Sequence, residues 1–267
     1  MLRTSEWINL FFLTFLIIVA WIRTLEQRRR FVITALGAAG IGLTLAGVYC
    51  SRWFPSSATA LLRDLLPSLL MLFVYWQSGG FLVETNQSLQ NFLMNLDEKL
   101  IGLLGANGES RSWLANFLEF CYLLCYPLVP LGIIVLHLAG LESYVDGYWT
   151  IVLLSTYLCY CPLPFVQMLP PRALAPSTEG RLNLHKLRLL NLTVLRYASI
   201  QVNTFPSAHV ASTFAASLVL LGRAPAVGVF FLIVAFGIAG GAFLGRYHYA
   251  ADVVLGILVA IGIYLIF

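Results

Sequence analysis

Two short stretches of this 267-residue chain carry residues that could perform phosphoryl transfer, and each lies at the edge of an apolar run. The first is the tetrapeptide Pro206–His209, and the second runs from Arg246 through His248 to Asp252. Because residues four apart share one face of a helix, the Asp252 carboxylate could accept a hydrogen bond from one imidazole nitrogen of His248. That contact would leave the other nitrogen free to attack phosphorus or to take up a proton.

The residues around this His/Asp pair complete a set suited to phosphate chemistry. Arg246 adds a permanent cation whose planar fork of donors fits phosphate oxygens. His209 adds a second imidazole and Ser207 a hydroxyl, both from the start of another expected helix. Two imidazoles, a carboxylate, a hydroxyl and arginines on one membrane face are what transfer through a phosphohistidine requires.

Each of these residues also has a plainer interpretation. A histidine at a helix end is usually a hydrogen-bonded polar residue, and Pro206 with Ser207 is a typical helix start. His-x-x-x-Asp spacing alone occurs on many helices. The occurrence of both motifs in this order, at two successive membrane edges, favours the catalytic interpretation.

The same residues resemble the motifs of the type 2 phosphatidic acid phosphatase superfamily. The tetrapeptide at 206–209 resembles its Pro-Ser-Gly-His motif, with Ala208 in place of glycine. His248 and Asp252 match the end of its third motif, Ser-Arg-x5-His-x3-Asp, although Gly241 and Ala242 stand at the Ser-Arg positions. The resemblance covers about residues 60–267.

The first motif of that superfamily, Lys-x6-Arg-Pro, is expected upstream of the other two. Its candidate arginine is Arg172, but Phe165 stands at the lysine position and Ala173 follows the arginine. Pro-Pro-Arg at 170–172, with Arg-Asp-Leu-Leu-Pro at 63–67, is more similar to the branch that includes inositol phosphotransferases and inositol phosphorylceramide synthases.

The resemblance implies a role for each site residue. His248 would be the nucleophile, oriented by Asp252, and His209 would protonate the leaving oxygen and then activate the acceptor. The phosphoryl oxygens would be bound by Arg172, Arg246, Ser207 and Ala208. Arginine side chains would supply the positive charge, and the predicted loops hold no cluster of acidic residues suited to Mg²⁺, so we expect no metal and no other cofactor.

Arg246 departs from the superfamily in register. The arginine of the third motif lies six residues before the histidine, whereas Arg246 lies two residues before His248. On a helix these positions differ by about 6 Å along the axis, a gap that a long arginine side chain could bridge.

The composition predicts a polytopic membrane protein. The chain is 60% hydrophobic and 10% charged, with a mean hydropathy of +0.85, whereas a soluble domain has about 25% charged residues. The net charge of +4 gives no support for nucleic-acid binding, since no basic patch with interleaved aromatic residues occurs. The five cysteines lie in or beside apolar runs without a CxxC motif, which indicates core residues.

Apolar runs predict an all-α bundle of about eight transmembrane helices, since about 20 residues cross a bilayer core. We expect residues 1–54 to form a two-helix N-terminal extension and residues 55–267 to form a six-helix, phosphatase-like core. The expected spans lie at about 8–22, 31–50, 61–83, 114–138, 148–166, 207–221, 225–244 and 249–266.

Residues 85–112 differ from these spans, because their apolar residues recur only on one helical face. The segment predicts an amphipathic helix that lies on the membrane surface or packs on its own protein. Next to an active site it could gate the substrate. Its apolar residues are Leu89, Phe92, Leu93, Leu96, Leu100 and Leu104.

With eight spans, the loops at 23–30, 84–112, 167–205 and 245–248 share one membrane face, which brings all three motifs to one side. The positive-inside rule makes this face cytoplasmic, since only four of the 16 Lys and Arg residues fall on the other. The resemblance implies instead an extracytoplasmic face, of the plasma (inner) membrane, and we favour that orientation. The four exceptions are Arg3, Arg52, Arg63 and Arg223.

Three functions fit these observations. The first is a lipid phosphate phosphatase with water as acceptor, and the second is a phosphotransferase that passes a head group to an alcohol such as inositol. The third, from another class, is a non-catalytic transporter or scaffold with polar residues along a pathway. The ionisable residues gather at one membrane edge and not at mid-bilayer, which favours an enzyme, with hydrolysis slightly ahead of transfer. Its expected partners are a membrane lipid phosphate and the bilayer, and the sequence leaves the oligomeric state open.

Overall fold

The computed structural model describes residues 1–103, 112–174 and 186–267, and most of these residues are helical. Within those ranges the one pairing of extended segments is an isolated bridge between Met168 and Asn203. The predicted all-α membrane bundle is therefore confirmed. Its helices are α1 (Thr4–Ile22), α2 (Gln27–Trp53), α3 (Ser57–Gly79), α4 (Gln87–Leu103), α5 (Ser112–Leu123), α6 (Cys125–Leu138), the 3-10 helix η1 (Glu142–Tyr144), α7 (Val145–Tyr160), α8 (Pro171–Leu174), α9 (Lys186–Ala198), α10 (Ala208–Arg223), α11 (Pro225–Leu244) and α12 (Ala250–Ile266).

The described helices give fewer full-length spans than the eight predicted. Four of them, α1, α2, α3 and α11, are long and apolar enough to cross a bilayer, and α5 with α6 would make a fifth. The helices α7, α10 and α12 have 16, 16 and 17 residues, which reach about 25 Å against a hydrocarbon core of about 30 Å. Prolines limit two of them, since α7 ends before Pro162 and α10 begins after Pro206.

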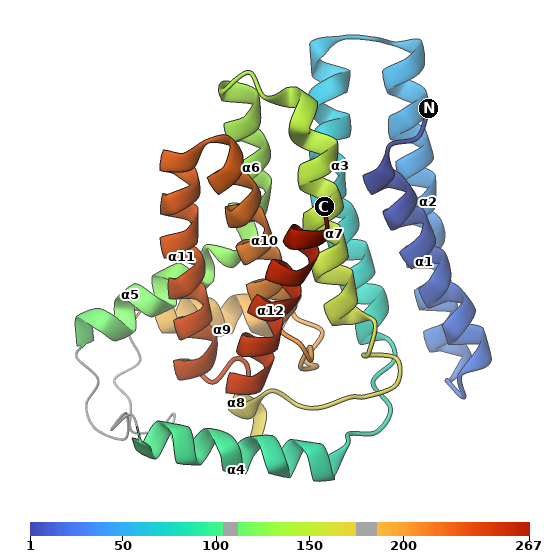
Figure 1. Cartoon of the computed structure of the whole chain (residues 1–267). Coiled ribbons are helices and arrows are strands. Elements are labelled where there is room, and N and C mark those ends of the chain that lie inside the picture. Colours follow the sequence, from blue (N-terminus) through green and yellow to red (C-terminus); the bar gives the residue numbers. More distant parts are fainter. Residues whose placement is uncertain (104–111, 175–185) are drawn as a thin grey trace.

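The predicted span at 114–138 is bent by 59° between α5 and α6. Pro127 has no N–H group to donate to the carbonyl of Leu123, four residues earlier, and its ring crowds that carbonyl. The helix therefore breaks at Leu124, and α5 turns away from the bundle axis (Figure 1).

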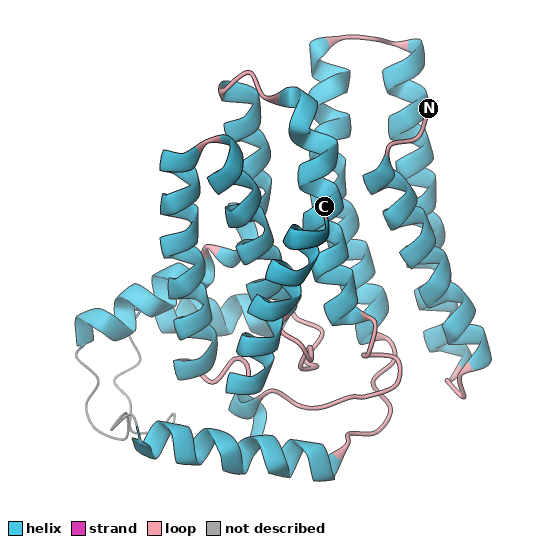
Figure 2. Cartoon of the chain, in the orientation of Figure 1, coloured by secondary structure: helices cyan, strands magenta, loops and turns pink. Residues whose placement is uncertain are grey.

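The loops that carry the predicted motifs gather at one end of the bundle (Figure 2). In Figure 1 the turn between α11 and α12, the segment that follows α7, and helix α4 lie toward the lower end. The α2–α3, α6–α7 and α10–α11 connections lie at the upper end. This alternation of ends agrees with the arrangement of loops expected from the sequence.

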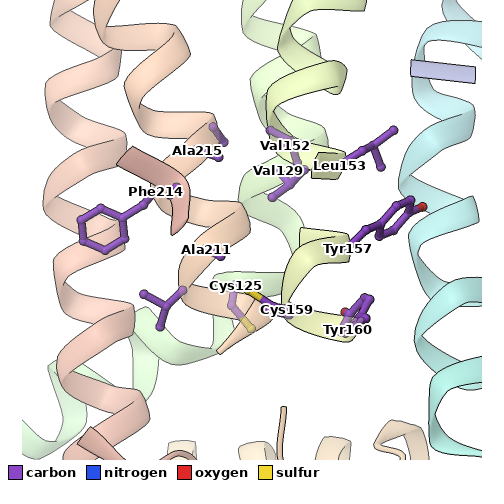
Figure 3. Packing of buried hydrophobic residues seen from close by; sticks show 14 of the residues in the cluster. Cys125, Val129, Val152, Leu153, Tyr157, Cys159, Tyr160, Ala211, Phe214 and Ala215 are labelled. Atoms are coloured by element: carbon purple, nitrogen blue, oxygen red, sulfur yellow. The ribbon is translucent and has the colours of Figure 1, made fainter. Parts of the chain in front are cut away.

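Helix α10 lies in the middle of the helices that carry the motifs, packed against α6, α7, α11 and α12. Its fully buried Ala211 and Ala215 let these neighbours approach closely (Figure 3). One hydrophobic core cluster runs from Phe12 in α1 to Ala260 in α12, and α1 packs directly against α7. The division into an extension and a core at residue 54 stays a prediction.

Helix α4 is the amphipathic helix predicted at 85–112, and residues 104–111 of that segment lie outside the described ranges. Its buried face places Leu93 against Met168 and Tyr249, while Phe92 on the other face is 64% exposed. The Asp97 carboxylate accepts a hydrogen bond of 3.0 Å from the amide of Ala250, at the start of α12. The helix therefore lies next to the loop that carries His248, and its roles at the membrane surface and as a gate stay predictions.

Candidate active site

The loop 245–249 carries His248 between the end of α11 and the start of α12. The amides of Tyr247 and His248 both donate to the carbonyl of Ala242, at 2.9 Å each, which closes the loop against α11. His248 Nδ1 lies 3.4 Å from Asp252 Oδ2, and both side chains are buried. The geometry thus directs Nδ1 at the carboxylate and leaves Nε2 on the other side of the ring.

Asn203 holds Asp252 in this position, and sequence reasoning missed it. Its Nδ2 donates to Asp252 Oδ2 at 2.7 Å, and the amide of Tyr249 donates to the same oxygen at 3.0 Å. The Asn203 amide donates to the carbonyl of Met168, which fixes its loop. The only sequence signal was its place three residues before Pro206, and a single asparagine in a long connection is not distinctive.

His209 lies in the first turn of α10 and faces the same space as His248. The centroids of the two imidazole rings are 6.0 Å apart, with the rings at 74° to each other. Three tyrosine rings surround His209, those of Tyr75, Tyr122 and Tyr126, at centroid distances of 6.4, 6.2 and 5.6 Å. The two histidines are therefore separated by several ångströms, as a phosphate bound between them would require.

A pocket opens between these two histidines. It contains about 290 Å³ of space between atoms, part of which is open to solvent. Aromatic rings and hydroxyl groups form most of its wall, and among the described residues Arg172 is the one cation in the lining. The residues that line it are Tyr75, Tyr122, Arg172, Leu195, Ser199, Val202, Thr204, His209, Tyr247 and His248.

Arg172 is positioned by the same loop that carries His248. Its amide donates to the carbonyl of Arg246 at 3.0 Å, and its guanidinium lies 5.9 Å from the centroid of the Tyr247 ring. Burial lowers the pKa of His248 to about 3, and the positive charge of Arg172 acts in the same direction. The imidazole of His248 is therefore neutral at neutral pH, the state in which it can act as a nucleophile.

Ser207 and Ala208 lie at the start of α10, against the start of α12. The Ser207 amide donates to the carbonyl of Asp252 at 2.9 Å, and the Ala208 amide donates to Thr204 Oγ1 at 3.3 Å. Both amides are thus bonded within the protein, and neither residue is in the pocket lining. Their predicted contact with phosphate stays a prediction.

Arg246 lies outside the pocket lining. Its backbone adopts a left-handed conformation, with φ of 56°, and its charge acts on Asp97 of α4. The expected bridging by its side chain assumed that Arg246 and His248 lie on one helix. That assumption is wrong, because residues 245–249 form a loop and α12 begins only at Ala250. Its predicted role in binding phosphate stays a prediction.

The departures from the third motif have structural reasons, and the residue at the lysine position of the first motif lies at the surface. A Cβ atom on Gly241 would lie 2.6 Å from the Leu118 carbonyl oxygen, so a serine does not fit where α11 approaches α5. Ala242 is fully buried in the core, where an arginine side chain has no room. Phe165, at the lysine position, is 55% exposed and lies 5.9 Å from the guanidinium carbon of Arg23.

The comparisons with known proteins agree with this geometry. A family model described as the PAP2 superfamily matches residues 91–266, which include both histidines, Asp252 and Arg172. No curated protein and no solved structure matches the chain.

Proposed function

Because the chain belongs to the PAP2 superfamily, we propose that it is an integral-membrane lipid phosphate phosphatase that acts through a phosphohistidine. Superfamily membership and the long apolar helices support the general part of this proposal, that the protein is a membrane enzyme with a phosphatase-type function. The phosphohistidine mechanism rests on the buried His248–Asp252 pair, whose Nδ1 and Oδ2 atoms are 3.4 Å apart. His248 lines a pocket together with His209 and Arg172.

In the proposed first step, Nε2 of His248 attacks phosphorus and the bond from phosphorus to the leaving alkoxide breaks. His209, as the imidazolium, gives a proton to that oxygen, so the lipid alcohol leaves as a neutral molecule and His209 becomes neutral. Asp252 stabilises the positive charge that the His248 ring acquires, and Arg172 stabilises the negative charge on the phosphoryl oxygens.

In the second step, His209 accepts a proton from water, and the water oxygen attacks phosphorus. The bond between phosphorus and His248 Nε2 breaks, which releases inorganic phosphate and returns the neutral imidazole. The neutral state of His248 at neutral pH follows from its buried position beside Arg172 and suits both steps.

A second candidate function is transfer of the phospho-head group to an alcohol acceptor such as inositol. The observation that favours it is the charge of the pocket, because Arg172 is the one permanent cation in the lining formed by described residues. A phosphodiester carries one negative charge and a phosphomonoester up to two, so one arginine matches the diester better. The branch of inositol phosphotransferases belongs to this second candidate.

The test of both candidates is product analysis with purified protein. A panel of lipid phosphates, lipid pyrophosphates and phosphodiesters is supplied, with and without inositol, and both inorganic phosphate and new phosphodiesters are measured. Phosphate release from monoesters supports hydrolysis, and a new inositol phosphodiester supports transfer. Absence of both products across the panel would contradict the enzyme proposal and favour the transporter or scaffold.

We expect turnover to survive removal of divalent metal ions. In the proposed steps the cation that meets the phosphate is the guanidinium of Arg172, and a side-chain cation is not extracted by a chelator. Phosphate release should therefore be unchanged after dialysis against EDTA. Loss of activity that Mg²⁺ restores would contradict this expectation.

We propose that the pocket faces the extracytoplasmic side of the plasma (inner) membrane. Cys50 tests this orientation, because it is exposed near the end of α2 that lies opposite the pocket, while Cys121, Cys125 and Cys159 are buried. A membrane-impermeant thiol reagent should label Cys50 only after cells are permeabilised. Labelling of Cys50, but not of a Cys50→Ser control, in intact cells would place the pocket in the cytoplasm.

A further inference from the structure

The carboxylate of Glu119, in α5, joins three parts of the structure next to the pocket. Its Oε2 accepts hydrogen bonds from Tyr247 Oη at 2.6 Å and from Asn191 Nδ2 at 2.7 Å. Its Oε1 accepts from Arg188 Nη1 at 2.9 Å. Only 13% of the Glu119 side chain is exposed, so these charge-assisted hydrogen bonds lie largely out of solvent.

Through this carboxylate, Glu119 fixes the loop that carries His248. The Tyr247 ring stacks on Tyr122, with 4.0 Å between centroids and 9° between planes, and the Arg188 guanidinium lies 4.7 Å from its centroid. Arg188 Nη1 also donates to the carbonyl of Gly245 at 2.8 Å. Residues 245 and 247 are thus both held from α5 and α9, and His248 follows directly.

The same contacts fix one wall of the pocket. Asn191 and Arg188 both belong to α9, and Asn191 Nδ2 also donates to the backbone carbonyl of Glu119 at 2.9 Å. Leu195 of α9 and Ser199, just after it, line the pocket that His209 and His248 share. A single carboxylate therefore sets both the loop of the nucleophile and the wall that faces it.

We propose that Glu119 is a positioning residue for the reaction, which holds Tyr247 and α9 so that His248 stays aligned with the phosphorus atom. This inference rests on the proposed function. Glu119 does not line the pocket, so it acts through Tyr247 and not on the substrate. Misplacement of a reacting group by 1 Å can cost about 100-fold in rate, which is the scale of effect that Glu119 would control.

Glu119→Gln removes the charge and keeps the size of the side chain. The amide has one oxygen for three donors, so its NH₂ group would face an N–H or O–H donor and leave at least one buried donor unpaired. We expect kcat to fall about 10- to 100-fold, with KM changed less than about threefold. Tyr247→Phe removes one donor and should lower kcat by a smaller factor.

The pH profile separates positioning from a loss of folded protein. His248 attacks as the neutral imidazole, and its low pKa depends on burial beside Arg172. The other ionisable groups around it are Asp252, His209 and the pocket tyrosines Tyr75, Tyr122 and Tyr247. A loosened loop admits water, which raises the pKa of His248 toward its usual value of about 6.5. The acidic limb of the kcat/KM profile should therefore move to higher pH in Glu119→Gln.

The experiment uses the full chain in detergent with the substrate on which the wild type is active. It compares the wild type, Glu119→Gln, Tyr247→Phe and the double variant, with Glu84→Gln and Tyr197→Phe as controls, because Glu84 and Tyr197 are exposed. We expect wild-type rates in both controls. The double variant should be no slower than Glu119→Gln, because the hydrogen bond between Tyr247 and Glu119 is already disturbed in the single variant and cannot be lost twice.

Three results would overturn the inference. Equal rates in the wild type and His248→Ala would remove the proposed function and this inference with it. If the wild type is active and needs His248, an unchanged kcat and an unchanged pH profile in Glu119→Gln would refute the positioning role of Glu119 and leave the proposed function standing. A lower rate with an unmoved acidic limb and a lower unfolding temperature would assign Glu119 a structural role only, because a smaller folded fraction scales the rate at every pH.

Discussion

His248→Ala should abolish release of phosphate from the lipid substrate, because the substitution removes the atom that we propose forms the bond to phosphorus. Loss of the nucleophile or its base in a catalytic set that acts as a unit costs on the order of 10⁶-fold in kcat. The rate of phosphate release should therefore fall to the background of the assay. The measurement is phosphate release by purified protein over a range of substrate concentrations.

A trapping experiment distinguishes the covalent step from general loss of activity. Wild-type protein quenched in alkali during turnover of a ³²P-labelled substrate should carry label as an alkali-stable, acid-labile phosphohistidine, and His248→Ala should carry none. His137→Gln is the matched control, because His137 bonds Asp64 at 2.9 Å and lies in the last turn of α6, whose end is opposite the pocket (Figure 1). Wild-type rates in His248→Ala would refute the phosphohistidine mechanism.

The parts of the fold that the sequence predicts are those with local signals. Apolar runs identify the long helices, because burial in lipid needs a continuous apolar segment. The periodic apolar face at 85–112 identifies α4 over Gln87–Leu103. The break at Leu124 was also readable in principle from Pro127, but the long apolar run around it outweighs one proline in a composition argument.

The structure brings His248 Nδ1 within 3.4 Å of Asp252 Oδ2, but by a different route from the shared helical face on which the sequence argument rests. His248 is not on the helix; it precedes α12, and Tyr249 is the N-cap residue. Asp252 is the third residue of α12 and accepts from the Tyr249 amide, as acidic residues at this position of a helix often do. This capping contact, and not a shared helical face, brings the carboxylate back toward the imidazole.

Residues that support the site from a distance could not be predicted. Asn203 bonds Asp252 across 49 residues of sequence, and Glu119 bonds Tyr247 across 128. Neither residue belongs to a motif or a periodic pattern, since the geometry that selects it exists only after the helices pack. Their chemistry is nevertheless ordinary, because buried polar groups near a site must find hydrogen-bond partners.

Asp252→Asn should lower kcat by at least about 100-fold, the scale on which loss of one preorganised electrostatic contact acts. Asp252 Oδ2 accepts from Asn203 Nδ2 and the Tyr249 amide, and the same oxygen faces His248 Nδ1. An asparagine oxygen at that place keeps both hydrogen bonds, so the fold should stay intact. The negative charge is lost, and with it the stabilisation of the positive ring that forms as His248 bonds phosphorus.

Asp252→Ala provides the comparison, because it removes the acceptor as well as the charge. The donors on Asn203 and Tyr249 would then lie unpaired in a buried site, which costs about 1–3 kcal/mol of stability. Phosphate release and thermal unfolding should therefore be measured on both variants: each should lose activity, and only Asp252→Ala should unfold at a lower temperature. A wild-type rate in Asp252→Asn would show that the charge is not needed, and an unfolding temperature as low as that of Asp252→Ala would show that the carboxylate acts mainly on the fold.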